Sequence, residues 1–289
     1  MALPLSEEQP EATPAGNSRS VEALEVELLI AGIARRYGYD FSNYARTSLT
    51  RRLRRAVREE GLSTISALQD RVLHDPVAMS RVIESISVHT TNMFRDGDVY
   101  RAIRDQVVPV LKTYPFVRIW HAGCSSGEEV YSLAILLQEE GIYDRCRIYA
   151  TDISDSILDR AKRGIFPLRA MREYTSNYQS AGGTQDFSSY YAADAANVVF
   201  RQSLRRNMIF SQHNLVCDAA FNEFQLILCR NVVIYFDQTL RSRVHELIHA
   251  SLAKLGILVL GKRESIRFTR VEPLYQELVP NLRIYRRMQ

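Results

Sequence analysis

The chain has 289 residues, of which 46% are hydrophobic and 24% are charged, and its formal net charge at pH 7 is +4. This is an ordinary globular composition, with room for one large domain and a smaller one. No run of about 18 apolar residues is present, so the sequence predicts no membrane-spanning helix. The net charge is too small to indicate any class of partner by itself.

The first 20 residues are acidic and rich in Pro and Ser, and they lack the basic and apolar regions of a signal peptide. We expect residues 1–20 to form a flexible tail and the protein to be cytoplasmic. The four cysteines agree with that location: Cys124, Cys146, Cys217 and Cys229. They show no CxxC spacing and lie in or beside apolar stretches, which predicts buried free thiols rather than disulfides or zinc ligands.

Residues 21–103 have a helical pattern. Apolar residues recur at three- and four-residue steps over 24–33. Ser63 or Thr64 is a candidate helix cap, and Pro76 marks a boundary or a first helical turn. No strand signal appears in this part of the chain, so it predicts a small all-α domain.

From residue 116 onward, strand and helix patterns alternate. Apolar strands are predicted at 117–124, 146–152, 224–231 and 257–261, with a final edge strand at 282–289. Helices are predicted at 128–141, 154–164 and 238–256. This alternation is typical of a mainly parallel sheet covered by helices on both faces. Residues 168–207 interrupt it with paired glycines and short alternations, which predict a small antiparallel β insert.

The stretch HAGCSSGEEVYSLAILL (121–137) leaves a predicted strand through small residues and begins a helix with two acids. In doubly wound sheets, ligands bind at the carboxyl ends of strands near the switch point. Gly123 and Gly127 would let a ligand approach the backbone closely. The GxGxxG spacing of dinucleotide binding is absent, and Glu128 at a helix start would repel phosphate. We therefore expect a ligand with positive charge or hydroxyl groups.

Asp152 ends the next predicted strand, where an acid is well placed to accept hydrogen bonds from both hydroxyls of a ribose. A nucleoside without phosphates and with a cationic, amino-acid-like tail fits these residues, and S-adenosylmethionine is such a molecule. The pattern alone leaves an alternative open. In it, Asp152 caps the following helix, and Glu128 and Glu129 complement a helix dipole.

Five motifs, in order along the chain, carry a family resemblance. They are SVHTTNMFRD (87–96), HAGCSSGEEVYSLA (121–134), IYATDIS (148–154), FSQHNLV (210–216) and LILCRNVVIYF (226–236). With them the chain resembles the CheR-type chemoreceptor glutamate O-methyltransferases over about residues 22–289. The resemblance implies an α/β fold. It consists of a Rossmann-like class I methyltransferase domain at 104–289 with the small antiparallel β insert, preceded by the all-α domain at 21–103.

The resemblance also implies an S-adenosylmethionine site. Its expected cofactor-binding residues are His89, Thr91, Arg95, Gly123, Glu128, Asp152, Asn214, Leu215, Asn231 and Val232. Arg95 would pair with the methionine carboxylate, Glu128 would face the methionine or ribose part, and Glu129 would support the turn. His89 stands where many relatives carry Asn. Arg95 and Tyr235 are the candidate catalytic residues, and Tyr235 either lines the methyl-transfer opening or belongs to the core.

By the same resemblance, Asp152 would hold the ribose, Asn214 and Leu215 would flank the adenine, and Asn231 and Val232 would close the pocket. Without the resemblance, Asn231 reads as a turn residue that bonds its own backbone. The implied reaction transfers a methyl group from S-adenosylmethionine to a glutamate carboxylate of a receptor, giving a methyl ester and S-adenosylhomocysteine. Because a carboxylate is already ionised at neutral pH, orientation rather than a general base would carry catalysis. The alternative is an inactive cofactor-binding docking module in a signalling complex.

Six arginines crowd residues 46–58, and Arg51, Arg54, Arg55 and Arg58 share one helix face beside an apolar stripe. The resemblance implies that this face docks the acidic methylation helices of a chemoreceptor-type partner. A solvated charged face is the alternative, and some of these arginines could also border the cofactor cleft. Nucleic-acid binding is not expected, because no aromatic or basic platform accompanies the run. We expect a monomer that does not insert into a membrane.

Residues 245–249 read HELIH, an HExxH match that places two imidazoles on one helix face for zinc, with Glu246 as base. Glu264 is the nearest downstream candidate for a third ligand. The match raises a zinc protease as a remote alternative. Since the apolar residues of this helix form one packing face between two apolar strands, we expect a chance match and no bound metal.

Overall fold

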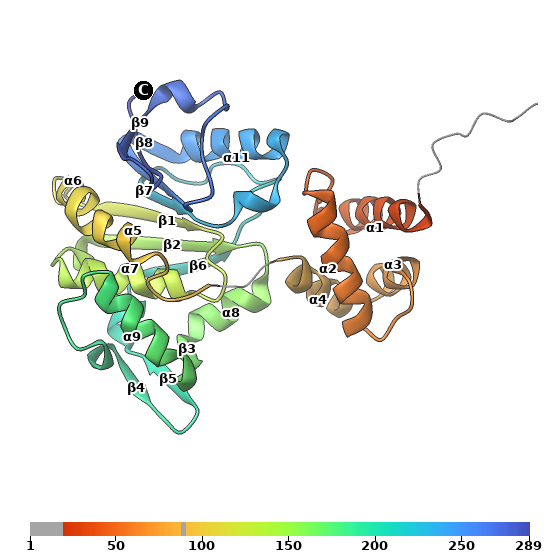
Figure 1. The fold of residues 1–289 in the computed structure, drawn as a ribbon, viewed down its shortest axis with the longest axis horizontal. Coiled ribbons are helices and arrows are strands. Elements are labelled where there is room, and N and C mark those ends of the chain that lie inside the picture. The colour runs from red at the N-terminus through yellow and green to blue at the C-terminus, as the bar shows by residue number, and fades with distance from the viewer. Residues whose placement is uncertain (1–19, 88–90) are drawn as a thin grey trace, which may run out of the picture.

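A computed structural model describes residues 20–87 and 91–289, so the expected tail up to residue 19 and His89 lie outside the described residues. Within these ranges the chain forms a helical domain and a sheet domain (Figure 1). Among the described helices, none has both the length and the apolar character that crossing a membrane requires.

The helical domain consists of α1 (Val21–Tyr37), α2 (Arg46–Glu59), α3 (Ile65–His74) and α4 (Pro76–Ile86). Side chains cap the starts of α1, α3 and α4: Thr64 accepts a hydrogen bond from the backbone of Ala67 at 3.0 Å, and Asp75 accepts one from Val77 at 2.9 Å. Pro76 occupies the first turn of α4, as predicted. The apolar faces of all four helices meet in one core.

The main sheet has seven strands in the order β6-β2-β1-β7-β8-β10-β9. Their bounds are β1 Val117–Ala122, β2 Cys146–Asp152, β6 Met208–Gln212, β7 Phe224–Cys229, β8 Leu252–Leu260, β9 Tyr275–Val279 and β10 Ile284–Arg287. The first five strands in that order are parallel to one another. The next strand, β10, pairs antiparallel with β8 on one side and with β9 on the other. The strand order reverses at β1, so the turn after β1 lies at the switch point of a doubly wound sheet.

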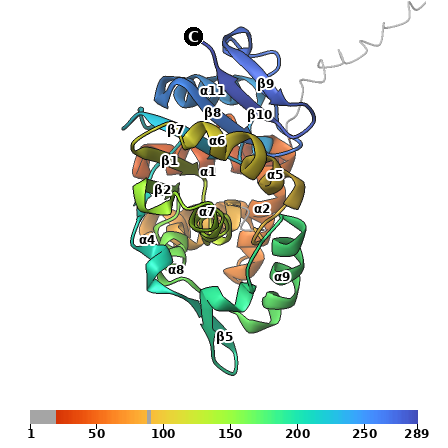
Figure 2. The same ribbon diagram turned by 90° about the vertical axis from the view of Figure 1, so that its left-hand side faces the viewer.

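Helices cover both faces of this sheet. On one face, α7 (Glu128–Glu139) packs with α5 (Gly97–Ala102) and α6 (Val108–Leu111), which the π-helical turn η1 (Ile103–Val107) connects. On the other face lies α11 (Gln238–Ser251), and Figure 2 shows α7 and α11 on opposite sides of the strands. α8 (Asp155–Arg163) follows β2. The predicted α/β architecture is therefore present.

The predicted insert is also present, with more helix than the sequence indicated. β3 (Ile165–Pro167), β5 (Asn197–Phe200) and β4 (Tyr191–Ala193) form a three-stranded antiparallel sheet. Between β3 and β4 lies α9 (Met171–Ser180), whose buried Met171, Tyr174 and Tyr178 follow a helical spacing. The short α10 (Gln202–Arg205) and the 3-10 turns η2 (Tyr143–Arg145), η3 (Leu168–Ala170) and η4 (Phe187–Tyr190) complete this part.

Three predictions at the carboxyl end are wrong in detail. The helix predicted over 238–256 ends at Ser251, because Leu252 pairs with Phe224 of β7. The next ladder pair is Leu226 with Ile257, so residues 253–256 form a bulge in β8. The strand predicted at the sheet edge, β10, lies between β8 and β9, and β9 was not anticipated.

The cysteine prediction holds for three of the four thiols. Cys124, Cys146 and Cys229 are buried, whereas Cys217 is exposed in the loop after β6, and all four are free. Cys217 follows the apolar pair Leu215-Val216, but it points outward and its Sγ lies 3.5 Å from the carbonyl oxygen of Gly38. Proximity to an apolar stretch was therefore an insufficient sign of burial.

The two domains meet directly at the start of α2. The backbone N–H of Ala45 donates to the carbonyl of Tyr235 at 3.0 Å, and that of Asp237 donates to the carbonyl of Asn43 at 2.9 Å. The Tyr44 ring packs edge-on against Phe236, with ring centroids 4.9 Å apart. This contact fixes the beginning of the basic helix beside the loop that follows β7.

Candidate active site

A cavity of approximately 110 Å³ lies where the carboxyl ends of the parallel strands face the helical domain. The segments that follow β1, β2, β6 and β7 supply most of its lining: Gly123, Cys124, Ser125, Asp152, Ile153, His213, Asn214, Leu215, Val216, Arg230, Asn231, Val232, Tyr235 and Phe236. Tyr44, Arg52, Ile86 and Ser87 of the helical domain close the other side, with Thr91, Arg95 and Glu129 completing the wall. The expected cofactor residues, His89 and Glu128 apart, are thus brought together.

The small-residue turn after β1 brings the backbone close to the opposite wall. Gly123 has a φ of +72°, and a Cβ there would lie 2.5 Å from Cγ2 of Val232. The N–H groups of Gly123 and Cys124 both donate to the carbonyl of Thr151 at 2.8 Å, which joins the turn to β2. Only glycine satisfies both the left-handed dihedral and this contact, so Gly123 shapes the cavity.

Asp152 lies at the end of β2 with 8% of its surface exposed and faces the turn. Its Oδ2 accepts a hydrogen bond from the N–H of Ser125 at 2.9 Å, and its Oδ1 accepts one from the N–H of Ser154 at 3.2 Å. The cap of α8 is Ser154, whose hydroxyl accepts from the N–H of Ile157. Asp152 is therefore a cavity acid and does not cap the following helix with its own side chain.

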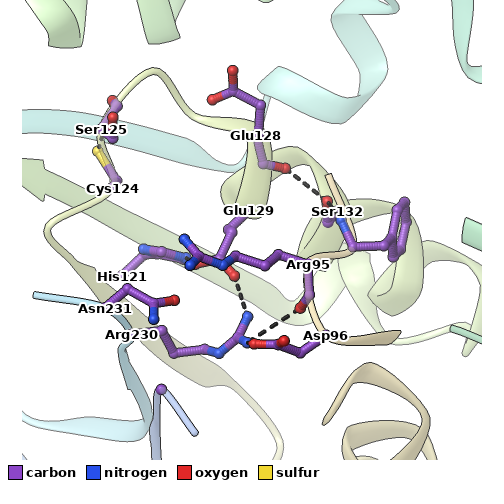
Figure 3. A network of polar contacts seen from close by, with 12 residues as sticks. Arg95, Asp96, His121, Cys124, Ser125, Glu128, Glu129, Ser132, Arg230 and Asn231 are labelled. Carbon is purple, nitrogen blue, oxygen red and sulfur yellow. Dashed lines mark hydrogen bonds and ion pairs between the residues drawn. The ribbon is translucent and has the colours of Figure 1, made fainter. Parts of the chain in front are cut away.

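The two acids at the start of α7 point in different directions (Figure 3). Glu129 lines the cavity and forms an ion pair with Arg230, and its Oε2 lies 3.7 Å from Nε2 of His121. Glu128 lies outside the cavity lining, where its carboxylate accepts a hydrogen bond from the hydroxyl of Ser126 at 2.6 Å. The structure thus places Glu129, rather than the expected Glu128, against the cavity.

Burial controls the charges around Glu129. It raises the pKa of the Glu129 carboxyl, while Arg230 opposes that shift. It also lowers the pKa of His121 to about 3, with Arg230 contributing in the same direction. Because this pKa lies far below physiological pH, the imidazole is neutral, and neither of its ring nitrogens has a hydrogen-bond partner in the described structure. The charge facing the cavity here is therefore carried by Glu129 and Arg230.

Arg230 is a buried connection that the sequence reasoning missed. One nitrogen of its guanidinium pairs with Glu129, and the other donates to Asp96 Oδ2 at 2.7 Å and to the carbonyl of Arg95 at 3.1 Å (Figure 3). It thereby fixes a turn in which Phe94 and Asp96 both have positive φ. Figure 3 shows the Arg95 side chain extending from that turn beside Glu129. A charged residue directly after the apolar run LILC was the available sequence signal.

Glu264 holds the opposite wall of the cavity. It is 3% exposed, and its Oε2 accepts hydrogen bonds from the N–H groups of Asn231 at 2.8 Å and Gly261 at 2.7 Å. Its Oε1 accepts one from the N–H of Ile234 at 3.3 Å. Asn231 is held at a φ of +60°, followed by the 3-10 turn η5 (Val233–Tyr235). The wall that contains Asn231, Val232 and Tyr235 therefore depends on one buried carboxylate.

Comparison with known families identifies this arrangement. Residues 89–277 match the family described as CheR methyltransferase, SAM binding domain, and residues 24–87 match CheR methyltransferase, all-alpha domain. The chain belongs to the CheR methyltransferase family. This confirms the resemblance, and the predicted fold class with its all-α domain and its S-adenosylmethionine-binding domain.

Individual relatives agree with the CheR family. A Pseudomonas putida protein named as a methyltransferase, Cher3, is 47% identical over 91% of this chain and 97% of its own length. A Listeria monocytogenes chemotaxis protein methyltransferase is 29% identical over 81% of this chain and 87% of its own. A solved Geobacter sulfurreducens SAM-dependent methyltransferase in complex with S-adenosyl-L-homocysteine shares 14% identity over 60% of this chain and 51% of that chain. Its TM-score is 0.33, a likeness that says nothing about the site.

The basic face of this CheR-family chain is divided by its ion pairs. Arg54 forms two hydrogen bonds with the carboxylate of Glu22 on α1, both at 2.5 Å. Arg51, Arg55 and Arg58 instead line a groove between α2 and α4, together with Arg81, three acids and two serines. Of these, Arg55 also pairs with Glu59 at 2.7 Å. Three of the four expected docking arginines therefore face this groove, and Arg54 is engaged within the domain.

The groove adjoins the cavity at the buried Arg52. Arg52 and Ser87 line both hollows, and the Arg52 guanidinium lies 4.2 Å from the centroid of the Tyr235 ring. Nη1 of Arg52 donates to the carbonyl of Ile86, whereas its buried Nη2 has no partner among the described residues. The expectation that an arginine of this helix borders the cleft thus applies to Arg52.

The two histidines of the HExxH match lie in different surroundings. His245 is buried without a hydrogen-bond partner in the described structure, and burial lowers its pKa to about 4. His249 faces Tyr275, with Nδ1 lying 3.3 Å from the phenol oxygen. Glu264 is occupied by backbone N–H groups, and no group of three metal ligands occurs within 20–87 and 91–289. Val244 and Ile248 of the same helix are buried, as the packing-face interpretation predicts.

Proposed function

We propose that this chain transfers a methyl group from S-adenosylmethionine to glutamate side chains of a chemoreceptor-type signalling protein. Family membership supports the reaction class, and the observation that carries the proposal is the cavity at the sheet's switch point. Two acids, Asp152 and Glu129, and the cation Arg95 line this cavity around the glycine turn. Relatives named chemotaxis protein methyltransferase support a chemoreceptor as the substrate.

The residues present fit the cofactor. Gly123 leaves the space that a Cβ would fill, so a nucleoside can approach the backbone of the turn. Asp152 would hold the ribose hydroxyls, Asn214 and Leu215 would flank the adenine, and Arg95 would pair with the amino-acid carboxylate. We assign the carboxylate that faces the cationic tail to Glu129, because Glu129 lines the cavity. Bound there, S-adenosylmethionine supplies an electrophilic methyl group and leaves as S-adenosylhomocysteine.

The chain's own contribution is orientation and exclusion of water. The acceptor carboxylate is ionised at neutral pH, so the site needs no strong base. Arg52 lies where the α2–α4 groove meets the cavity, and its guanidinium stacks on the ring of Tyr235, so both side chains would flank an entering glutamate. Partial burial of this junction weakens water's competition as anion and cation combine, and the fixed wall holds the two reactants in line.

The test begins with calorimetric titration of the full chain with S-adenosylhomocysteine. We expect saturable micromolar binding that Asp152→Ala weakens at least about 50-fold, because a buried acid accepting ribose hydroxyls is lost. Asp159→Ala is the matched control, since Asp159 is an exposed acid of α8 that pairs with Lys162. Unchanged affinity in Asp152→Ala would reject the ribose assignment.

The second test separates catalysis from docking. The protein is incubated with methyl-labelled S-adenosylmethionine and a chemoreceptor cytoplasmic fragment from the same organism. Label on the receptor that is released by base identifies a glutamate methyl ester. Cofactor binding without such label would favour the alternative, a docking module that binds the cofactor but transfers nothing.

A further inference from the structure

The loop after β8 presents one aromatic side chain to solvent. Phe268 is 90% exposed, more than any other large hydrophobic residue in the described part of the chain. The residues around it alternate in burial: Ile266 and Thr269 are buried, and Arg267 is exposed. The loop is therefore anchored to the protein by some side chains while others are held outward.

The backbone at Phe268 is fixed in this orientation. Its φ is +62°, a left-handed conformation that costs energy for a residue with a bulky side chain. Its N–H donates to Glu272 Oε2 at 2.7 Å, and its carbonyl accepts from Gln238 Nε2 at 3.3 Å. The N–H of Thr269 donates to the carbonyl of Ile266 at 3.2 Å. A strained, braced loop that holds an exposed aromatic ring is preorganised for contact.

Basic residues outnumber acidic ones in this loop. Four basic residues occur in the loop: Lys262, Arg263, Arg267 and Arg270. Lys262 pairs with Asp98 at 2.6 Å, and Arg270 lies 3.9 Å from Glu246 while its side chain remains 88% exposed. The other two make no ion pair with any described residue. Aromatic and arginine side chains together are enriched at the energetic centres of protein interfaces, and exposed arginines are complementary to an acidic partner.

The loop is also connected to the wall of the cavity. Glu264, at its start, binds the N–H groups of Asn231 and Ile234. Gln238, which holds the Phe268 carbonyl, lies three residues after Tyr235. The start of α2 bonds to the same segment from the other domain. Two basic surfaces, the α2–α4 groove and this loop, therefore join the segment that carries Tyr235.

We propose that Phe268, Arg263, Arg267 and Arg270 form a second docking surface for the acidic helices of the receptor substrate. In this arrangement, Phe268 inserts between helices of the receptor while the arginines pair with its carboxylates. The inference rests on the proposed function, because the acidic partner is the protein that receives the methyl group. The second docking surface would recognise the folded receptor without contacting the cofactor or the reacting glutamate.

The test measures receptor methylation by the full chain with Phe268→Ala and with Arg267→Glu. We expect the KM for the folded receptor fragment to rise about tenfold in each variant, while kcat and S-adenosylhomocysteine affinity stay at parental values. A short glutamate peptide, which cannot span both surfaces, should be methylated at the parental rate. Phe116→Ala is the matched control, because Phe116 is 45% exposed and lies at the amino end of β1, whereas the cavity lies at the carboxyl ends of the strands.

The outcomes separate this inference from the proposed function. Absence of receptor methylation by the parent would overturn the proposed function, and the docking surface with it. Parental methylation with an unchanged receptor KM in both loop variants would overturn the docking surface alone. Cosedimentation with phosphatidylserine vesicles that Phe268→Ala abolishes, together with an unchanged receptor KM, would assign the loop to a membrane and also reject the inference.

Discussion

Replacing Glu264 by Gln tests whether one buried carboxylate holds the cavity wall. The parent carboxylate accepts three backbone hydrogen bonds, from Asn231, Gly261 and Ile234. An amide of the same shape has only one acceptor oxygen, so its NH₂ group must face at least one of these N–H donors. At least one buried donor then loses its partner, and the remaining bonds lose the assistance of the charge.

The expected cost follows from these contacts. Leaving one buried donor unpaired costs about 1–3 kcal/mol, and hydrogen bonds to charged groups are stronger than neutral ones by about 1 kcal/mol each. Burial raises the pKa of the Glu264 carboxyl, which shows that its charge is costly to bury, so removing that charge offsets part of this loss. We therefore expect Glu264→Gln to lower the free energy of unfolding by about 2 kcal/mol, and to weaken S-adenosylhomocysteine binding about tenfold as the Asn231 wall loosens.

Denaturant unfolding and calorimetric titration measure the two effects at neutral pH. Glu223→Gln provides the control, because Glu223 is an exposed acid in the loop before β7. If Glu264→Gln matched the parent in both stability and affinity, the carboxylate would not support the wall. A loss of stability with parental affinity would confine its role to folding.

Three further predictions concern pH, strain and charge. Burial and Arg230 lower the pKa of His121 to about 3, so its contribution to stability is complete above about pH 6.5 and is lost as the pH falls toward 3. Urea titrations between pH 7 and pH 4.5 should therefore show His121→Asn losing about 2–3 kcal/mol less unfolding free energy than the parent. Phe268→Gly removes left-handed strain of about 1 kcal/mol and should raise the thermal midpoint by about 2–4 °C in calorimetry, whereas an unchanged or lower midpoint would contradict the strain. Arg58→Ala should raise the receptor KM several-fold, and Arg54→Ala should leave it near the parental value because α1 already neutralises that side chain; equal effects would refute the division of the basic face.

Local signals in the sequence predicted much of the site. The small-residue turn, the acid after the second strand and the start of α7 are all set by neighbouring residues, and the structure places them at the switch point. The identity of the inward-facing acid was not local. It depends on Arg230, which lies 101 residues from Glu129 in the sequence and meets it only because β7 pairs with β1. Periodicity does not record such a contact.

The errors in the fold have the same origin. Residues 252–256 continue the helical pattern of α11, but pairing of Leu252 with Phe224 converts them to a strand with a bulge. The order β8-β10-β9 likewise follows from antiparallel pairing between segments whose own sequences indicate only short strands. Burial of Met171, Tyr174 and Tyr178 made α9 helical in a region whose glycines and tyrosines had suggested hairpins.

The cavity wall shared between the two domains has a consequence for how the chain unfolds. Each domain has its own hydrophobic core, so each is a candidate cooperative unit in the absence of ligand. A molecule that touches Arg52 on one side and Asp152 on the other binds only when both units are folded and in contact. Its binding free energy therefore adds to the association of the domains. We therefore expect a ligand that fills the cavity to merge the two melting units into one and to make the α2–α4 groove more rigid.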